Sequence, residues 1–217
     1  MRLTRILFLL AVGLAALGTA NAEPPPPGQA AELVAQAFQD ATAALRDHEQ
    51  ELRDAPQAAK RLMLDILAPH VDFQLLSRLV LGQHWRTASP EERERFVAAF
   101  RTSLIDTYAA ILTANMDRVL AVLDSGATAL TVRRLIPGKD PRRVSVATHM
   151  NLGEQAVAVD FQLTARHGRW QVYDVVIEGI SFVASRRSEF AGLLQHESLA
   201  QVIERLEAGG AAASDTP

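Results

Sequence analysis

The 217-residue chain contains no cysteine. It therefore folds without disulfides and depends on its hydrophobic core for stability. It also cannot be anchored to a membrane through a lipidated N-terminal cysteine. Apart from the first residues, no segment has the ~18 consecutive apolar residues that indicate a membrane span. We therefore expect the chain that follows this first segment to be soluble.

Catalytic and nucleic-acid-binding signatures are missing as well. The chain has no P-loop, no dinucleotide fingerprint, no Gly-x-Ser-x-Gly elbow and no His-Glu-x-x-His motif. Its six histidines lack metal-ligand spacing, and the nearest candidate, His70-x-Asp72, is better explained by capping or surface hydrogen bonding. Without Arg2 and Arg5, 20 basic residues stand against 25 acidic ones, a net charge of −5. A nucleic-acid-binding protein is instead expected to present a basic face.

The N-terminus has the features of a signal peptide. Arg2 and Arg5 supply the positive charges, and the apolar run Ile6–Leu17 is shorter than the ~20 residues of a membrane span. Ala20 and Ala22 form the small-residue pattern that predicts cleavage after position 22. The alternative, an N-terminal membrane anchor, is disfavoured by the short run and by the four prolines that follow. Export without disulfides or a lipid anchor favours the bacterial periplasm.

The rest of the chain is expected to form one domain. Residues 1–22 are the expected signal peptide, 23–29 a proline-rich leader, 30–208 a single domain and 209–217 a disordered tail. Apolar residues recur at helical spacing from residue 30 to residue 112. Asp72 is placed to cap one helix and Gly82 to end it, and Ser89 with Glu92 predicts a capping box at the start of a long helix.

After Asn115 the apolar period changes from helical to two. The alternation begins at Val119 and continues through four further segments, near 130–134, 144–150, 157–163 and 172–177, with short turns between them. Short turns predict antiparallel hairpins, and residues 188–195 and 198–208 are predicted to form two closing helices. The expected fold class is α+β: N-terminal and C-terminal helices packed on one face of a four- to five-stranded antiparallel meander sheet, with an apolar cavity between.

Strand alternation also predicts which side chains face the helices. Around residue 175, Tyr173, Val175 and Ile177 should face the helices, and Val172 and Val176 should face the back of the sheet.

The two acidic residues on the best strands have the opposite parity. Asp160 and Asp174 should point away from the helix-covered face, so that face lacks an acid or a base on these strands. This disfavours an enzyme with an isomerase-like pocket, and no catalytic residue is assigned.

One hairpin is rich in positive charge: Arg133, Arg134, Lys139, Arg142 and Arg143. A solvated turn explains it most simply. The functional alternative is an electropositive rim for an anionic head group or for a partner surface.

Three segments together are similar to the MlaC/toluene-tolerance family of periplasmic phospholipid-binding proteins. They are VLGQHWRTASPEERERFVAAF at residues 80–100, its continuation with Leu104 and Tyr108, and YDVVIEGISFVASRRSEF at residues 173–190. The resemblance covers nearly all of residues 30–206. The sequence departs from the family where an asparagine–tyrosine–arginine run is often found, since Ser185, Arg186 and Arg187 occupy these positions.

The resemblance implies a function that composition does not reveal. Such proteins carry a phospholipid across the periplasm between outer- and inner-membrane complexes and so support the lipid asymmetry of the outer membrane. The implied partners are an inner-membrane ABC transporter with an MCE-domain subunit and an outer-membrane lipoprotein associated with a porin. The phospholipid is cargo, and no cofactor, metal, nucleic acid or enzymatic activity is implied. The alternatives are a small periplasmic enzyme, a binding protein for another apolar small molecule, or a structural module whose apolar face is filled by its own side chains.

The resemblance and the strand parity together give a set of candidate lipid-contacting residues. The candidates on the helical side are Leu76, Val80, Phe100, Leu104 and Tyr108, and Phe182, which follows the last strand, is a further candidate. The candidates on the sheet side are Val132, Val144, Val146, Met150, Val157, Val159, Phe161, Tyr173, Val175 and Ile177.

Overall fold

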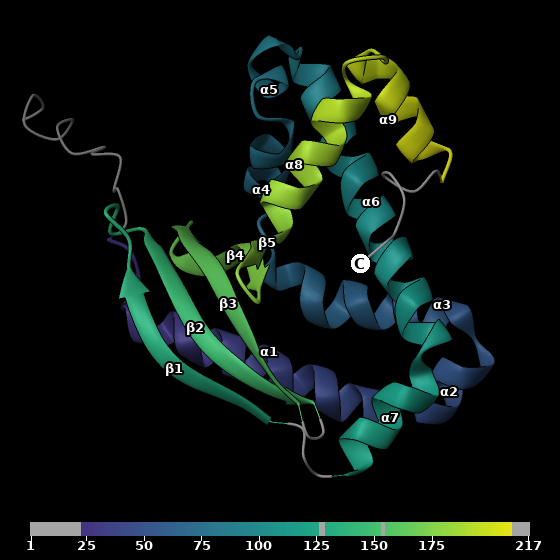
Figure 1. Cartoon of the computed structure of the whole chain (residues 1–217), viewed down its shortest axis with the longest axis vertical. Helices are drawn as coiled ribbons and strands as arrows, with labels where there is room; N and C mark the ends of the chain where they lie inside the picture. Colours follow the sequence, from purple (N-terminus) through teal and green to yellow (C-terminus); the bar gives the residue numbers. More distant parts are fainter. Residues whose placement is uncertain (1–22, 126–128, 153–154, 210–217) are drawn as a thin grey trace, which may run out of the picture.

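The computed structural model describes residues 23–125, 129–152 and 155–209 (Figure 1). The expected signal peptide with its cleavage site and nearly all of the expected tail lie outside these residues. Within the described ranges, no helix has both the length and the apolar character needed to cross a membrane.

Helices come first along the chain and strands follow, as expected for the α+β class. The helical half comprises α1 (Pro27–Asp47), α2 (Glu49–Asp54), α3 (Pro56–Leu62), the π-helical turn η1 (Met63–Leu67), the 3-10 turn η2 (Ala68–His70), α4 (Phe73–Leu81), α5 (His84–Thr87), α6 (Pro90–Ala114) and α7 (Met116–Asp124). The second half comprises β1 (Ala129–Pro137), β2 (Arg143–Leu152), β3 (Gln155–Arg166), β4 (Arg169–Ile177), β5 (Ile180–Ser181), α8 (Phe182–Leu193) and α9 (Leu199–Glu207).

The predicted helix caps are confirmed. The Asp72 carboxylate accepts a hydrogen bond from the Leu75 backbone N–H at 2.9 Å and begins α4. Gly82 ends α4 with a positive φ of 55°, a conformation that glycine adopts without a steric penalty. At the start of α6, the Glu92 N–H donates to the Ser89 hydroxyl and the Ser89 N–H donates to the Glu92 carboxylate. This capping box fixes the first turn of the longest helix.

Helices α7 and α8 differ from the sequence prediction. Residues 116–124 form helix α7 rather than the start of a strand, because the buried side chains are Met116, Leu120 and Leu123, which follow helical spacing. Helix α8 begins at Phe182, six residues earlier than predicted. The Ser181 hydroxyl accepts from the Ala184 N–H at 3.0 Å and so caps the helix immediately after β5.

The five strands form an antiparallel meander in the order β1-β2-β3-β4-β5. Helix α1 packs across one face of this sheet (Figure 1). Its residues Ala30 and Val34 share one buried cluster with Val144 and Val146 of β2 and Trp170 of β4. Helix α1 begins at Pro27. The end of the segment 23–29, which was expected to be a proline-rich leader, is therefore helical.

The opposite face of the sheet is polar. It carries the alternate residues of β2 and β3, and the Gln162 side-chain amide donates to the Ser145 hydroxyl across the two strands at 3.0 Å. Asp160 lies on this face beside Ala147 and Val176, as its parity predicts.

A bulge in β4 overturns the prediction for Tyr173 and Val172. Gln162 pairs with Asp174, but the next residue of β3, Leu163, pairs with Val172, so Tyr173 is the extra residue. An extra residue reverses the parity of the strand beyond it. Val172 consequently packs with the α1 cluster. The Tyr173 hydroxyl instead accepts from Arg143 on the polar face at 3.3 Å.

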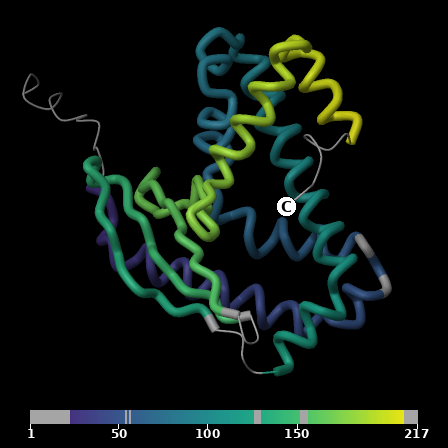
Figure 2. Tube along the Cα trace, viewed as in Figure 1, coloured from purple at the N-terminus to yellow at the C-terminus, as the bar shows by residue number. Residues whose placement is uncertain are grey.

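The remaining helices join the sheet mainly along β4 and β5 (Figure 2). The Asp72 N–H donates to the Val172 carbonyl at 2.8 Å, which ties the start of α4 to the edge of β4. Beyond this edge, α4, α6, α8 and α9 enclose Phe96, Phe100 and Phe190, whose ring centroids lie 5.4 Å apart in each pair. The expected α+β architecture is therefore confirmed, with α1 on one face of the sheet and a helical layer at its β4–β5 edge.

Candidate functional site

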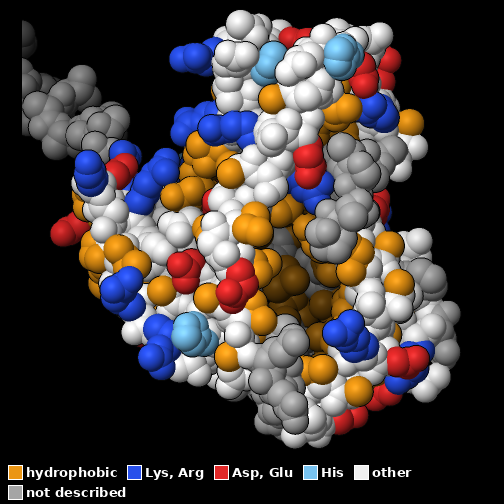
Figure 3. Space-filling view, in the orientation of Figure 1, with side chains coloured by type: hydrophobic (Ala, Val, Ile, Leu, Met, Phe, Trp, Pro, Cys, Tyr) orange, Lys and Arg blue, Asp and Glu red, His pale blue; other side chains and the backbone are white. Residues whose placement is uncertain are grey.

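The space-filling view shows a hollow lined by hydrophobic side chains between the β4–β5 edge of the sheet and helix α6 (Figure 3). Five large hydrophobic residues in elements around it are more exposed than their size would favour: Leu67, Tyr108, Ile111, Ile177 and Ile180, at 37–68% of their surface. Single exposed apolar residues are common on proteins, so these five matter because their elements border a hollow that is itself lined by hydrophobic side chains.

The buried residues form three separate clusters. A helical cluster lies among α4, α6, α8 and α9, a second cluster lies among α2, α3, α6 and α7, and a sheet cluster lies between α1 and the strands. A domain of this size normally has one contiguous core with small satellites. None of the three clusters includes the five exposed residues.

Helix α6 supplies the wall of the hollow farthest from the sheet. Leu104, Tyr108 and Ile111 are spaced at i, i+4 and i+7, so they lie on one side of the helix. Leu104 packs against the helical cluster, and the Tyr108 ring lies 6.3 Å from the ring of Phe182, which directly follows β5. This side of α6 therefore faces Phe182 at the start of α8. Ile111 continues the same side of α6 by about one turn.

An arginine replaces the expected aromatic residue at the rim. Arg186, where the family often has tyrosine, places its guanidinium 5.3 Å from the centre of the Phe182 ring and donates to Glu189 at 2.8 Å. A guanidinium can stack on an aromatic face as a ring does. Arg186 thus covers Phe182 on one side while Tyr108 contacts it on another, and Arg187 donates to the Leu79 carbonyl.

The sequence candidates separate into three groups in the structure. Members of the helical cluster, buried or partly buried, are Leu76, Val80, Phe100, Leu104 and Phe182. Members of the sheet cluster beneath α1 are Val132, Val144, Val146 and Phe161. The candidates outside all three clusters are Tyr108, Met150, Val157, Val159, Tyr173, Val175 and Ile177. Contact of these residues with a lipid stays a prediction.

Three exposed apolar residues in the elements around the hollow are not among the sequence candidates: Leu67, Ile111 and Ile180. Ile111 continues the apolar stripe of α6 by one turn, which is the signal that could have identified it. Leu67 lies in the π-helical turn, and Ile180 lies beyond the tight Glu178-Gly179 turn with φ of 48° and 83°. Neither position follows a regular period.

The carboxylates near the hollow have structural partners. Asp174 accepts from the Ser181 hydroxyl at 2.6 Å and from the Val183 N–H at 2.9 Å, so it caps α8. Glu178 accepts from the Ala158 N–H in the neighbouring strand. Asp72, the earlier His70-x-Asp72 candidate, caps α4 and pairs with Arg166 at 3.4 Å. No group of three or more potential metal ligands occurs within the described ranges.

The fold and the hollow define a class: an α+β binding protein whose sheet and helices leave an apolar interior open to a hydrophobic molecule. The chain belongs to the MlaC family, whose model, described as the MlaC protein, matches residues 35–208.

Individual relatives agree with this assignment. The chain is similar to the intermembrane phospholipid transport system binding protein MlaC of Haemophilus influenzae, with 21% identity over 175 residues, which cover 81% of this chain and 79% of the relative. It is also similar to the toluene tolerance protein ttg2D of Pseudomonas putida, with 28% identity over 155 residues, which cover 70% of this chain and 66% of the relative.

A solved structure shares the fold. A phospholipid-binding protein from Ralstonia solanacearum, solved in complex with a phospholipid, superposes with a TM-score of 0.68 at 21% sequence identity. The superposition covers 83% of this chain and 96% of the other. The meander sheet with its helices is therefore a fold that this chain shares with a phospholipid-binding protein of known structure.

Proposed function

We propose that this protein is a phospholipid carrier that holds acyl chains in the apolar hollow. The observation that carries the proposal is the hollow lined by hydrophobic side chains (Figure 3), together with the exposed apolar residues of η1, α6, β4 and β5, the elements around it. The family's names and the phospholipid complex of the Ralstonia solanacearum protein indicate the same class of ligand.

Transfer energetics fit a carrier better than an enzyme. Burying hydrocarbon is worth ~25 cal/mol per Å² relative to water, so a lipid tail would stabilise the exposed Ile177, Ile180 and Ile111 side chains. A lipid that comes from one bilayer and returns to another gains little net hydrocarbon energy. The hollow only has to resemble a membrane interior, and the direction of transfer must come from partners.

The proposal extends to the compartment and the route. The family is periplasmic, and residues 1–22 fit an export signal with cleavage after Ala22. The carrier would exchange lipid with an inner-membrane ABC transporter complex that has an MCE-domain subunit and with an outer-membrane lipoprotein–porin complex. Such exchange would help to keep phospholipid out of the outer leaflet of the outer membrane.

The proposal is tested by matched substitutions and lipid mass spectrometry. Ile111→Asp places a charge on the α6 wall at a side chain that is 42% exposed, so the fold tolerates it, but hydrocarbon would have to desolvate the carboxylate. Ile136→Asp is the control, because Ile136 is 38% exposed and its partner in the sheet is Ser145 on the polar face.

We expect wild type and Ile136→Asp to purify from the periplasm with near-stoichiometric diacyl phospholipid and Ile111→Asp to lose most of it. Equal lipid content in both variants would remove α6 from the binding site. Absence of any diacyl lipid from wild-type protein, or a different apolar compound in its place, would contradict the carrier function.

A further inference from the structure

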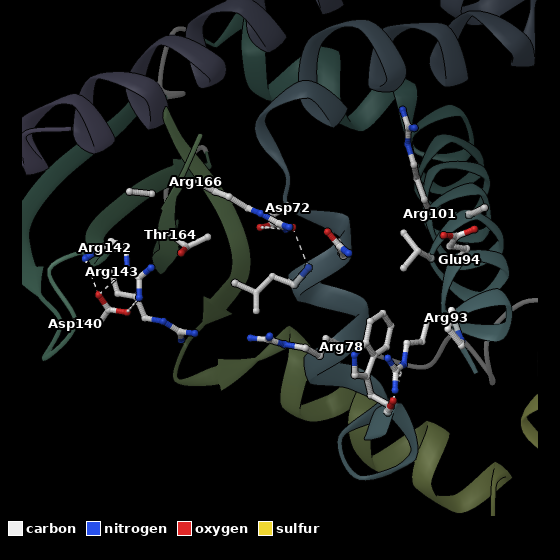
Figure 4. A pocket seen from close by; sticks show the side chains of 17 residues that line it. Asp72, Arg78, Arg93, Glu94, Arg101, Asp140, Arg142, Arg143, Thr164 and Arg166 are labelled. Carbon is white, nitrogen blue, oxygen red and sulfur yellow. Dashed lines mark hydrogen bonds and ion pairs between the residues drawn. The ribbon is translucent and has the colours of Figure 1, made fainter. Parts of the chain in front are cut away.

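A second concavity lies beside the β1–β2 turn and the end of β3. It is an open groove of about 990 Å³ between the β1–β2 and β3–β4 turns on one side and helices α4, α5 and α6 on the other (Figure 4). A smaller concavity of about 420 Å³ continues from it, and the two share Asp72, Arg101 and Arg166. None of the five exposed residues of the apolar hollow lines either one.

Positive charge dominates this groove, which we call the arginine groove. Its lining includes the guanidiniums of Arg78, Arg93, Arg101, Arg142, Arg143 and Arg166, and Arg169 lines the continuation. Three carboxylates stand against these seven cations: Asp72, Glu94 and Asp140. The whole chain carries a net charge of −3, so the groove is a local reversal of the protein's charge.

Three of these cations are positioned by contacts that leave their charge uncompensated. Arg101 lies 5.4 Å from the centre of the Phe73 ring, and Arg143 lies 4.9 Å from that of Tyr173. Arg93 donates to the Trp85 carbonyl at 2.9 Å.

Only two of the arginines lining the groove form ion pairs with a described carboxylate, Arg142 with Asp140 at 3.2 Å and Arg166 with Asp72 at 3.4 Å. Within the described ranges, Arg78, Arg101 and Arg143 have no carboxylate within ion-pair distance.

We propose that the arginine groove binds an acidic segment of a protein partner. Guanidiniums held by rings and carbonyls are preorganised for the bidentate hydrogen bonds that carboxylates accept. The groove is walled on both sides and continues past Arg101 towards Arg169, so it suits a narrow protruding chain, whereas a flat bilayer surface cannot reach its floor. This inference goes beyond the proposed function, because it concerns a surface separate from the hollow that would hold lipid.

The test compares two triple variants of the full exported chain. The groove variant is Arg78→Gln, Arg101→Gln and Arg143→Gln. The control variant removes the same charge from three exposed arginines that do not line the groove: Arg118→Gln, Arg133→Gln and Arg134→Gln. The probe is a fluorescein-labelled peptide of alternating glutamate and alanine, measured by fluorescence anisotropy at low and at physiological salt. A peptide with glutamine in place of glutamate is the neutral probe.

We expect the glutamate peptide to bind wild type and the control variant alike, and the groove variant at least about tenfold more weakly, since each exposed ion pair contributes a factor of about two to five. Binding should weaken with salt, and the glutamine peptide should not bind. Equal binding by both triple variants would overturn the proposal. So would binding of anionic phosphatidylglycerol vesicles that depends on the groove arginines when the glutamate peptide shows none.

Two further measurements keep the result unambiguous. If the groove variant fails to fold, Arg78→Gln alone serves, because this exposed side chain has no hydrogen bond or ion pair in the described structure, and a loss of about twofold or more is then expected. The lipid content of every variant is measured in parallel. Loss of peptide binding at full lipid content supports the groove, whereas normal lipid content with unchanged peptide binding overturns the groove and leaves the carrier function standing.

Discussion

Phe100 is the candidate residue for which the structure makes the sharpest prediction. Its ring is fully buried and contacts the rings of Phe96 and Phe190 with centroids 5.4 Å away. Replacing a buried phenylalanine by alanine costs about 3–5 kcal/mol, and the two ring contacts place Phe100→Ala towards the upper end. This loss is a large part of the ~5–15 kcal/mol by which a domain is stable. For a chain of this size it should lower the thermal unfolding midpoint by roughly 6–20 °C.

The assays are thermal unfolding, for the midpoint, and urea unfolding, for the free energy, both followed by circular dichroism on delipidated protein. Lipid must be removed first, since a ligand that binds only the folded state adds to the apparent stability. Lipid content is measured separately on the protein as purified. Phe100→Ala should lose stability, while the fraction that remains folded should keep its lipid.

Tyr108→Ala is the matched comparison, because Tyr108 is on the same helix but 37% exposed at the hollow. It should cost less than ~1–2 kcal/mol and reduce lipid content, since little of its packing lies in the core. The reasoning would be refuted if Phe100→Ala cost under ~1 kcal/mol and abolished lipid binding, because the ring would then face the cargo rather than the core.

Two more predictions concern helix caps. Hydrogen bonds from the Ser89 backbone and hydroxyl hold the pKa of Glu92 below its ordinary value of 4.5. The charged cap therefore stabilises the fold above pH 4.5, and this contribution is lost as the pH falls through the lowered pKa. Glu92→Gln should have a lower melting temperature than wild type at pH 7. In thermal scans the difference should shrink as the pH falls below 4.5 and vanish once the pH is below the lowered pKa of Glu92; a constant difference would argue against the charge. Asp174→Ala should cost about 2 kcal/mol in urea unfolding by removing the hydrogen bonds that start α8, with faster amide exchange at Val183. An unchanged exchange rate at Val183 would show that α8 does not depend on this cap.

Local signals in the sequence were reliable where backbone groups and short-range spacing decide the structure. The caps at Asp72 and Ser89 were predicted correctly, because an N-cap needs only a side-chain acceptor and the amides of the next turn. The polar-face position of Asp160 followed from the two-residue period of an unbroken stretch of β3.

Predictions failed where two periods fit equally well or where one residue interrupted a strand. Val119 and Leu123 fit both an alternating and a helical pattern, and packing of Leu120 and Leu123 decided for helix α7. The bulge at Tyr173 had no local signal. It is set by contacts across the sheet and with α8, which place Tyr173 beside Arg143 and Asp174 beside Ser181.

The sequence by itself determined most of the element types, the caps, the α+β order and the resemblance to the MlaC family, since each rests on neighbouring residues or on a motif. Only the tertiary structure decided which apolar residues are core and which are exposed. Phe100 and Tyr108 both belong to the apolar stripe of α6. Phe100 is fully buried, whereas Tyr108 is 37% exposed. Likewise, the arginines of the arginine groove come from α4, α6, the β1–β2 turn and the ends of β2, β3 and β4. Their proximity depends on how distant segments pack, which no local pattern encodes.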